Sequence, residues 1–177
     1  MKQLVSDILA YSQARVADTT FEAITPRTLL DHAMRLVGID SDVVQLDVQG
    51  QGIVWGSLPQ LGVVLSNLLS NARKYAHPER ELRVRVSVRE DAEGCEWEIA
   101  DNGIGIDMKY AHRIFELFQR LHTRSEYPGT GIGLALCASI VERHGGSIAL
   151  KASDASGSIF TFRLPSPGAS GHAGAER

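Results

Sequence analysis

Residues 60–75 combine an apolar stripe with a polar row, and this pattern predicts a helix. From Leu61 onward, apolar residues recur at three- and four-residue steps, so they share one face that can be buried. Asn67, Asn71 and Lys74 recur at the same kind of step and share a neighbouring face. Alone, the pattern also fits an ordinary amphipathic helix whose polar side is solvated.

Similar patterns predict the elements before and after this helix. Thr25, followed by Pro26, has the features of a helix start, and Ser57 can cap the central helix. Further helices are expected over residues 1–15, 26–38, 109–118 and 131–144. Strands are expected over residues 21–24, 43–48, 53–55, 82–88, 97–101, 148–150 and 160–164.

The order of these elements predicts a fold class and a division of the chain. Strands joined by hairpins, with helices in separate stretches, favour an antiparallel-rich sheet covered by helices on one face. Residues 18–165 are expected to form this domain. Residues 1–17 begin inside an uncapped helix, which is typical of the end of a longer element. Residues 166–177 are rich in Gly, Ala and Ser and are expected to be disordered.

Composition narrows the classes of function. The chain has 177 residues, of which 44% are hydrophobic, and this is ordinary for a globular core. A net charge of −3 gives no general attraction to nucleic acid or to an anionic membrane. No apolar run is long enough for a membrane span, and the two cysteines lack metal-type spacing. We therefore expect a cytoplasmic segment without nucleic-acid partners or membrane insertion.

The first chemistry-bearing segment is Asp101-Asn-Gly-Ile-Gly-Ile106, at the end of a predicted strand. A carboxylate there can accept a hydrogen bond from an exocyclic amine, and Gly103 and Gly105 let the backbone approach a flat ring. By itself the segment is weak evidence, because Asp-Asn-Gly is also a common turn.

The second segment, Gly129-Thr-Gly-Ile-Gly-Leu134, precedes and opens a predicted helix. Backbone N–H groups and the positive end of the helix dipole suit polyphosphate binding there. The spacing is not that of a Walker loop, and a loop rather than a strand precedes it, unlike a dinucleotide-binding motif.

Taken together, the central helix and the two glycine-rich segments resemble the ATP-binding core of the GHKL superfamily. Its Bergerat fold is an α/β (α+β) two-layer sandwich, with a mixed, largely antiparallel sheet covered on one face by helices. Residues 114–121 resemble the phenylalanine-containing box of sensor histidine kinases, and the stretch that follows is most similar to phytochrome-type kinases. Residues 1–14 resemble the second helix of the dimerisation and phosphotransfer hairpin of such kinases.

The resemblance implies roles for individual residues. Asn71 would be the Mg²⁺ ligand, with Asn67 as a supporting polar contact, and Asp101 would accept from the adenine amine. Arg120 would reach the γ-phosphate of ATP, where charge builds up during transfer. The resemblance places Asn67, Lys74 and Arg120 in catalysis. It implies that residues 121–130 form a hinged lid. The residues that it assigns to nucleotide binding are Asn71, Lys74, Tyr75, Asp101, Gly103, Gly105, Ile106, Arg120, Leu121, His122, Gly129, Thr130, Gly131, Gly133 and Leu134.

The residue four positions before Asn71 separates the subclasses of the superfamily. ATP-hydrolysing relatives and anti-sigma serine kinases carry a glutamate there, which removes a proton from water or a hydroxyl. Here the residue is Asn67, which is no base at neutral pH. A histidine acceptor already has a lone pair, so Asn67 favours histidine phosphorylation. The alternatives are a GHKL ATPase, a serine kinase, or a non-catalytic nucleotide-binding regulatory module.

No histidine in the chain has the surroundings of the family's phosphorylated histidine. His77 precedes a helix-breaking proline, and His122 lies in the expected lid. The resemblance therefore implies an ATP-binding, phosphoryl-donating domain that is inactive alone. Its partners would be the acceptor hairpin of the same kinase, a response regulator and a second kinase copy in a homodimer, with ATP and Mg²⁺ as cofactors.

Overall fold

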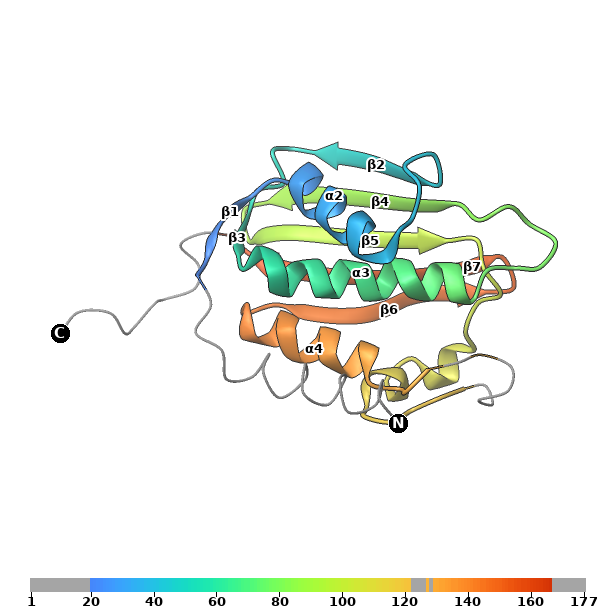
Figure 1. Ribbon diagram of the computed structural model, residues 1–177. Helices are drawn as coiled ribbons and strands as arrows, with labels where there is room; N and C mark the ends of the chain where they lie inside the picture. Colours follow the sequence, from blue (N-terminus) through green and yellow to red (C-terminus); the bar gives the residue numbers. More distant parts are fainter. Residues whose placement is uncertain (1–19, 122–126, 128, 167–177) are drawn as a thin grey trace.

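The structure is a computed structural model, and it describes residues 20–121, 127 and 129–166 (Figure 1). The helix expected over residues 1–15, the segment 1–17 and His122 lie outside the described residues. The same holds for the expected tail, apart from Ser166. Among the described residues, no helix has the length and apolar character that crossing a lipid bilayer requires.

A five-stranded sheet forms one layer of the domain, in the order β2-β4-β5-β7-β6 (Figure 1). β2 pairs with β4 in parallel, and every other pair in this sheet is antiparallel. The sheet is thus mixed and largely antiparallel, which confirms the predicted fold class. Its strands are β2 (Val44–Gln49), β4 (Val84–Asp91), β5 (Gly94–Asp101), β6 (Ser147–Asp154) and β7 (Gly157–Pro165).

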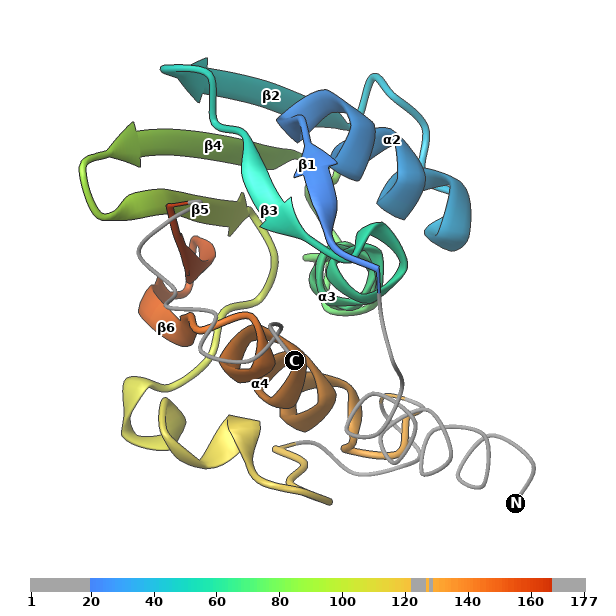
Figure 2. The ribbon, with the colours of Figure 1, turned by 90° about the vertical axis from the view of Figure 1, so that its left-hand side faces the viewer.

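Among the described residues, three helices form the second layer, on one face of this sheet (Figure 2). They are α2 (Pro26–Val37), α3 (Leu58–Lys74) and α4 (Gly133–Arg143). Both predicted caps are present, because Thr25 Oγ1 accepts from the Thr28 N–H and Ser57 Oγ from the Gln60 N–H. A small antiparallel sheet of β1 (Glu22–Ile24) and β3 (Val54–Gly56) lies at one end of the domain.

The core lies between the two layers and follows the predicted alternation. Trp97 and Phe162, on neighbouring strands, are both buried, and their rings stack at 5.5 Å. On the other face of β4, Arg85 and Arg89 are exposed. Burying a large apolar side chain contributes about 1.5–3 kcal/mol, so this inner face holds the helices against the sheet.

One predicted element is different in the structure. Instead of a helix over residues 109–118, there are two 3₁₀ turns, Met108–Tyr110 and Arg113–Phe115. The second turn is held by tertiary contacts, since Ile114 is buried and the Phe115 ring meets Phe160 edge-on at 6.5 Å.

Candidate nucleotide-binding site

A cavity of about 450 Å³ opens between α3, the start of α4 and the ends of β5 and β7. Every predicted site residue lines it except Gly103, which lies beside it, and His122, which is outside the described residues. The predicted residues that line it are Asn67, Asn71, Lys74, Tyr75, Asp101, Gly105, Ile106, Arg120, Leu121, Gly129, Thr130, Gly131, Gly133 and Leu134.

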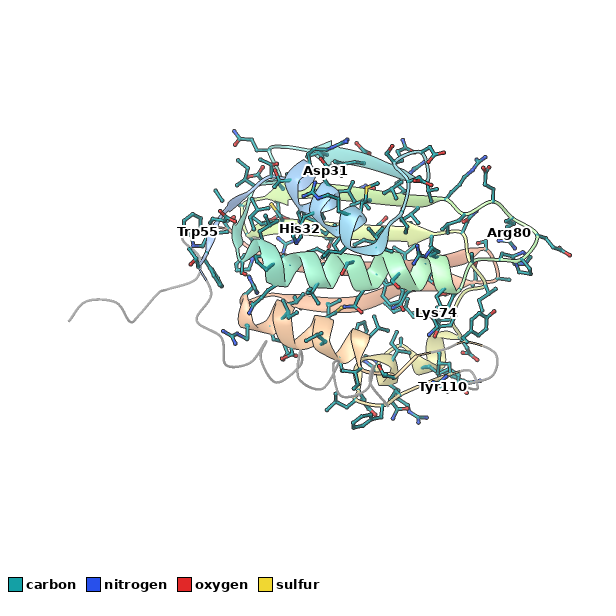
Figure 3. The ribbon with its side chains drawn as sticks, in the orientation of Figure 1. Asp31, His32, Trp55, Lys74, Arg80 and Tyr110 are labelled. Carbon is teal, nitrogen blue, oxygen red and sulfur yellow. The ribbon has the colours of Figure 1, made fainter. Side chains whose placement is uncertain are left out.

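Helix α3 supplies the polar row that its sequence pattern predicted. Asn67 donates from Nδ2 to the Val63 carbonyl at 2.9 Å, so its side chain is held against its own helix. The Asn71 carboxamide lines the cavity and makes no hydrogen bond to any residue that the structure describes. Lys74 Nζ lies 4.6 Å from the centre of the Tyr75 ring, at the C-terminal end of α3 (Figure 3).

Asp101 ends β5 and lines the cavity, and its carboxylate is held by the backbone. Oδ1 accepts from the Gly103 N–H at 2.8 Å. Burial raises the pKa of the Asp101 carboxyl, and hydrogen bonds from the backbone N–H groups of Gly103 and Ser158 partly oppose this. An acceptor that is half-buried and already oriented is suited to a neutral N–H donor such as an exocyclic amine.

The glycines of both segments sit where a side chain would collide. Gly105 has φ +75°, and a Cβ atom there would overlap the Asp154 carbonyl. Gly131 also has φ +75°, and a Cβ atom would lie 2.8 Å from the Gln119 carbonyl oxygen. The second segment therefore approaches the phenylalanine box through its backbone, and the Phe118 N–H donates to the Gly131 carbonyl at 3.0 Å.

The phenylalanine box brings a second cation to the cavity. Arg120 lines it and donates from Nη2 to the Tyr127 carbonyl at 2.8 Å. The Tyr127 ring lies 4.9 Å from the Tyr75 ring. Lys74 and Arg120 are thus positive groups on the cavity wall, with the half-buried carboxyl of Asp101 at another part of it.

Several residues of the lining were not predicted from the sequence. The most informative is Ser158, which is buried and stands opposite Asp101 in the pairing of β5 with β7. Apolar residues alternate over 160–164, and extending this alternation two residues toward the N-terminus would have predicted that residue 158 faces the same way. The other unpredicted residues are Val63, Ser70, Ile114, Gln119, Ile132, Leu136 and Phe160. They are mostly apolar and suit a flat ring.

The side chains of the described residues also indicate how the site could hold Mg²⁺. Within the described ranges there is no cluster of three His, Cys, Asp or Glu side chains that would hold a metal ion. In a nucleotide site Mg²⁺ keeps several waters and takes only one or two protein oxygens together with phosphate oxygens, so such a cluster is not required. The carboxamide oxygen of Asn71 lines this wall and could serve as one such ligand.

Comparison with known proteins supports the same assignment. Residues 56–168 match the family of histidine kinase-, DNA gyrase B- and HSP90-like ATPases. The chain is 34% identical over 170 residues to the phytochrome-like protein Cph1 of Synechocystis sp., covering 93% of this chain and 22% of that protein. It is 36% identical over 175 residues to cyanobacterial phytochrome A of Nostoc sp., with the same coverage. The chain thus spans about a fifth of the length of these relatives.

Solved structures agree with this result. The mycobacterial sensor histidine kinase MprB has a TM-score of 0.65 and 28% identity, with 82% of this chain and 97% of that chain covered. The ATP-binding domain of PrrB from Mycobacterium tuberculosis has a TM-score of 0.64 and 28% identity, covering 83% and 98%. The chain therefore belongs to the histidine kinase-, DNA gyrase B- and HSP90-like ATPase family, and within it resembles the ATP-binding domains of two-component histidine kinases.

Proposed function

We propose that this chain binds Mg-ATP in the cavity and donates the γ-phosphate to a histidine on a dimerisation hairpin. The observation that supports it most is the convergence of the α3 row, Asp101, the backbone ahead of α4 and Arg120 on one cavity of about 450 Å³. These groups come from distant parts of the sequence. Each is ambiguous alone, whereas together they match the two ends of a nucleotide.

At the adenine end, Asp101 accepts a hydrogen bond from the exocyclic amine, while Ile106 and Phe160 provide apolar walls. Ser158 supports the carboxylate through its backbone N–H. Guanine presents a carbonyl oxygen in place of the amine, which leaves two acceptors facing each other. The site thereby selects adenine.

At the phosphate end, Lys74 and Arg120 neutralise charge, and the backbone N–H groups at the start of α4 donate to phosphate oxygens. Asn71 would hold Mg²⁺ from the protein side, and the ion supplies charge neutralisation between the phosphates when it is bound. Arg120 gives one of its five N–H donors to the Tyr127 carbonyl, so others remain for a γ-phosphate, where charge builds up during transfer. We assign transfer, more than binding, to Arg120 for that reason.

Asn67 bears on the choice between the candidate reactions. A hydrolase or a serine kinase needs a base beside the γ-phosphate, and the amide at this position cannot remove a proton. Asn67 is also tied to the Val63 carbonyl. A histidine nucleophile needs no such base, so the geometry favours phosphoryl transfer to histidine. A non-catalytic nucleotide-binding module is the second candidate, because the acceptor histidine is not among the residues of this chain.

The wider assignment follows from the relatives. We propose residues 18–165 as the catalytic domain, residues 1–17 as the end of the hairpin helix, and residues 166–177 as a tail. One solved neighbour, the histidine kinase ThkA, is described as a complex with a response regulator, at 22% identity and a TM-score of 0.69. On this basis we propose a response regulator as a partner of the whole protein. From the family resemblance we also propose a homodimeric kinase and a cytoplasmic location.

Calorimetric titration of the chain with ATP, with and without Mg²⁺, tests the proposal. We expect ATP and ADP to bind, the affinity for ATP to rise with Mg²⁺, and GTP to bind weakly. Absence of ATP binding at millimolar nucleotide would contradict it. An affinity for ATP that does not change with Mg²⁺ would contradict the roles proposed for the metal and for Asn71.

A further inference from the structure

His144 forms a buried junction between the two helices of the nucleotide site. It follows the last residue of α4 and is 5% exposed. The Ser57 backbone N–H donates to His144 Nε2 at 3.1 Å, and Nδ1 lies 2.8 Å from the Ile140 carbonyl oxygen. A carbonyl only accepts, so Nδ1 carries the proton and Nε2 is an acceptor. The ring is therefore neutral, in one defined tautomer.

The surroundings of the ring leave it little freedom. The Phe21 ring stacks on it at 4.7 Å with an interplanar angle of 6°. A Cβ atom at Gly56 would lie 2.8 Å from His144 Cδ2, so only glycine fits there without displacing the imidazole. Burial lowers the pKa of His144, and the nearby charge of Arg143 adds to this. Phe21, Gly56 and Ser57, which meet the ring from the other elements, carry no charge.

The bond to Ser57 acts at one end of a pair of antiparallel helices. Ser57 caps α3, and Asn67 lies ten residues further along the same helix, about 15 Å away at 1.5 Å per residue. The start of α4 lies against Asn67, since a Cβ atom at Gly133 would come 2.7 Å from Asn67 Oδ1. α4 thus holds α3 at two places, and His144 is the more distant from the cavity.

We propose that His144 is a positioning residue of the nucleotide site, which sets the axial position of α3 through the Ser57 N–H and thereby places Asn67 and Asn71. The inference rests on the proposed function. Ser57 is 1% exposed, so without His144 its N–H would be a buried donor with no acceptor. The α3 start can relieve this only by moving toward another acceptor or toward water, and the polar row moves with it.

Three substitutions separate this role from simple packing. In His144→Gln, the amide oxygen can occupy the place of Nε2 and accept from Ser57. In His144→Asn, the shorter side chain can donate to the Ile140 carbonyl but does not reach Ser57. His144→Phe keeps a ring against Phe21 and loses both hydrogen bonds. Gln and Asn both lose the ring, so they form a matched pair in which Gln can keep the bond to Ser57 and Asn can keep the bond to Ile140.

We expect His144→Asn and His144→Phe to raise the Kd for Mg-ATP about tenfold, a typical size for coupling between sites. We expect His144→Gln to stay within about twofold of the parent. Titrations are made at a temperature at which circular dichroism shows each variant folded. The side-chain amide resonances of Asn67 and Asn71 should shift in the first two variants and stay in place in the third.

Other results would overturn the inference. If all three variants, while folded, have the parent's Kd and amide resonances, His144 only stabilises the fold. Equal losses in Gln and Asn would assign the effect to the ring instead of the bond to Ser57. If the parent itself fails to bind ATP, the proposed function falls, and the amide resonances alone decide the positioning role.

If the Asn and Phe variants do not fold, acid titration of the parent gives the answer. Protonated Nε2 can no longer accept from Ser57, so the amide resonances of Asn67 and Asn71 should then follow the midpoint of the His144 ring. Resonances that do not respond at that midpoint would contradict the inference.

Discussion

The side-chain oxygen of Asn67 occupies the space that a side chain at Gly133 would need, since a Cβ atom there would come within 2.7 Å of Oδ1. Asn67 is held in that position by its hydrogen bond to the Val63 carbonyl. The amide of α3 and the first residue of α4 are therefore in direct contact beneath the cavity. This contact couples the helix that carries the polar row to the segment proposed to hold phosphates.

The contact predicts a non-additive pair of mutations. Gly133→Ala should push the Asn67 amide away and raise the Kd for Mg-ATP about five- to twentyfold, within the range for directly contacting residues. Asn67→Ala removes the obstacle, so adding Gly133→Ala to it should cost little more. Calorimetry on the two single variants and the double variant gives the coupling energy. Fully additive effects would show that the two residues do not share this space.

A second prediction concerns the metal ligand. Asn71→Ala should remove most of the rise in ATP affinity that Mg²⁺ causes, because Asn71 supplies the proposed protein oxygen. Ser70→Ala, at a neighbouring residue of the same cavity, is the matched control and should keep that rise. The measurement is ATP titration over a series of Mg²⁺ concentrations. An Asn71→Ala variant with the parent's dependence on Mg²⁺ would contradict the assignment.

Asp101→Asn should separate binding from stability. Because the Gly103 N–H would hold the amide oxygen of the new asparagine, its NH2 group would face the adenine amine, and ATP binding should weaken by about 1–3 kcal/mol, roughly 5- to 150-fold. Stability should not fall at pH 7. The raised pKa means that ionising Asp101 costs free energy in the folded state, so its contribution to stability is present below pH 3.8 and is lost as pH rises through the folded pKa.

Calorimetry and urea unfolding at pH 7 check both parts of this prediction. The comparison of nucleotides needs only the parent chain, which should bind GTP more weakly than ATP by a similar margin. Equal affinity of the parent for ATP and GTP would remove Asp101 from adenine selection. A large loss of stability in Asp101→Asn would show that its charge supports the fold.

His144 predicts a pH dependence of stability. The pKa of His144 is lowered from 6.5 in the folded state, so below pH 6.5 the unfolded chain binds a proton that the folded chain does not. The free energy of unfolding should then fall by up to about 1.4 kcal/mol per pH unit between 6.5 and the folded pKa. His144→Gln lacks this group and should show a shallower slope. Urea unfolding at pH 7.5 and 5.5 measures the change in the free energy of unfolding with pH. The same change in the parent and in His144→Gln would contradict the prediction.

The last prediction concerns catalysis by the chain alone. It should bind Mg-ATP without labelling itself on histidine or hydrolysing ATP appreciably, because no histidine here has the acceptor's surroundings and Asn67 supplies no base. With a hairpin that carries the acceptor fused upstream, labelling should appear, and Arg120→Ala should then reduce transfer more than binding. Radiolabelled ATP with an acid-lability test checks both. Strong acid-labile label on the 177-residue chain would contradict the proposal.

The sequence by itself determined the features that depend on neighbouring residues. Helical geometry brings residues three and four apart onto one face, so the row of Asn67, Asn71 and Lys74 could be predicted before any fold was known. Caps act within one turn, and Thr25 and Ser57 were predicted for the same reason. The glycine-rich segments were visible as motifs, and their resemblance to a known family joined them into one site.

Only the tertiary structure decided which distant groups meet. The parallel pairing of β2 with β4, the approach of Ser158 to Asp101 and the bond between Ser57 and His144 join residues that no local period relates. The pattern over 109–118 predicted a helix, whereas the structure has two 3₁₀ turns there, with Ile114 and Phe115 packed on the core. Side-chain periodicity specifies which face of an element is buried, whereas packing of the whole chain specifies what that face meets.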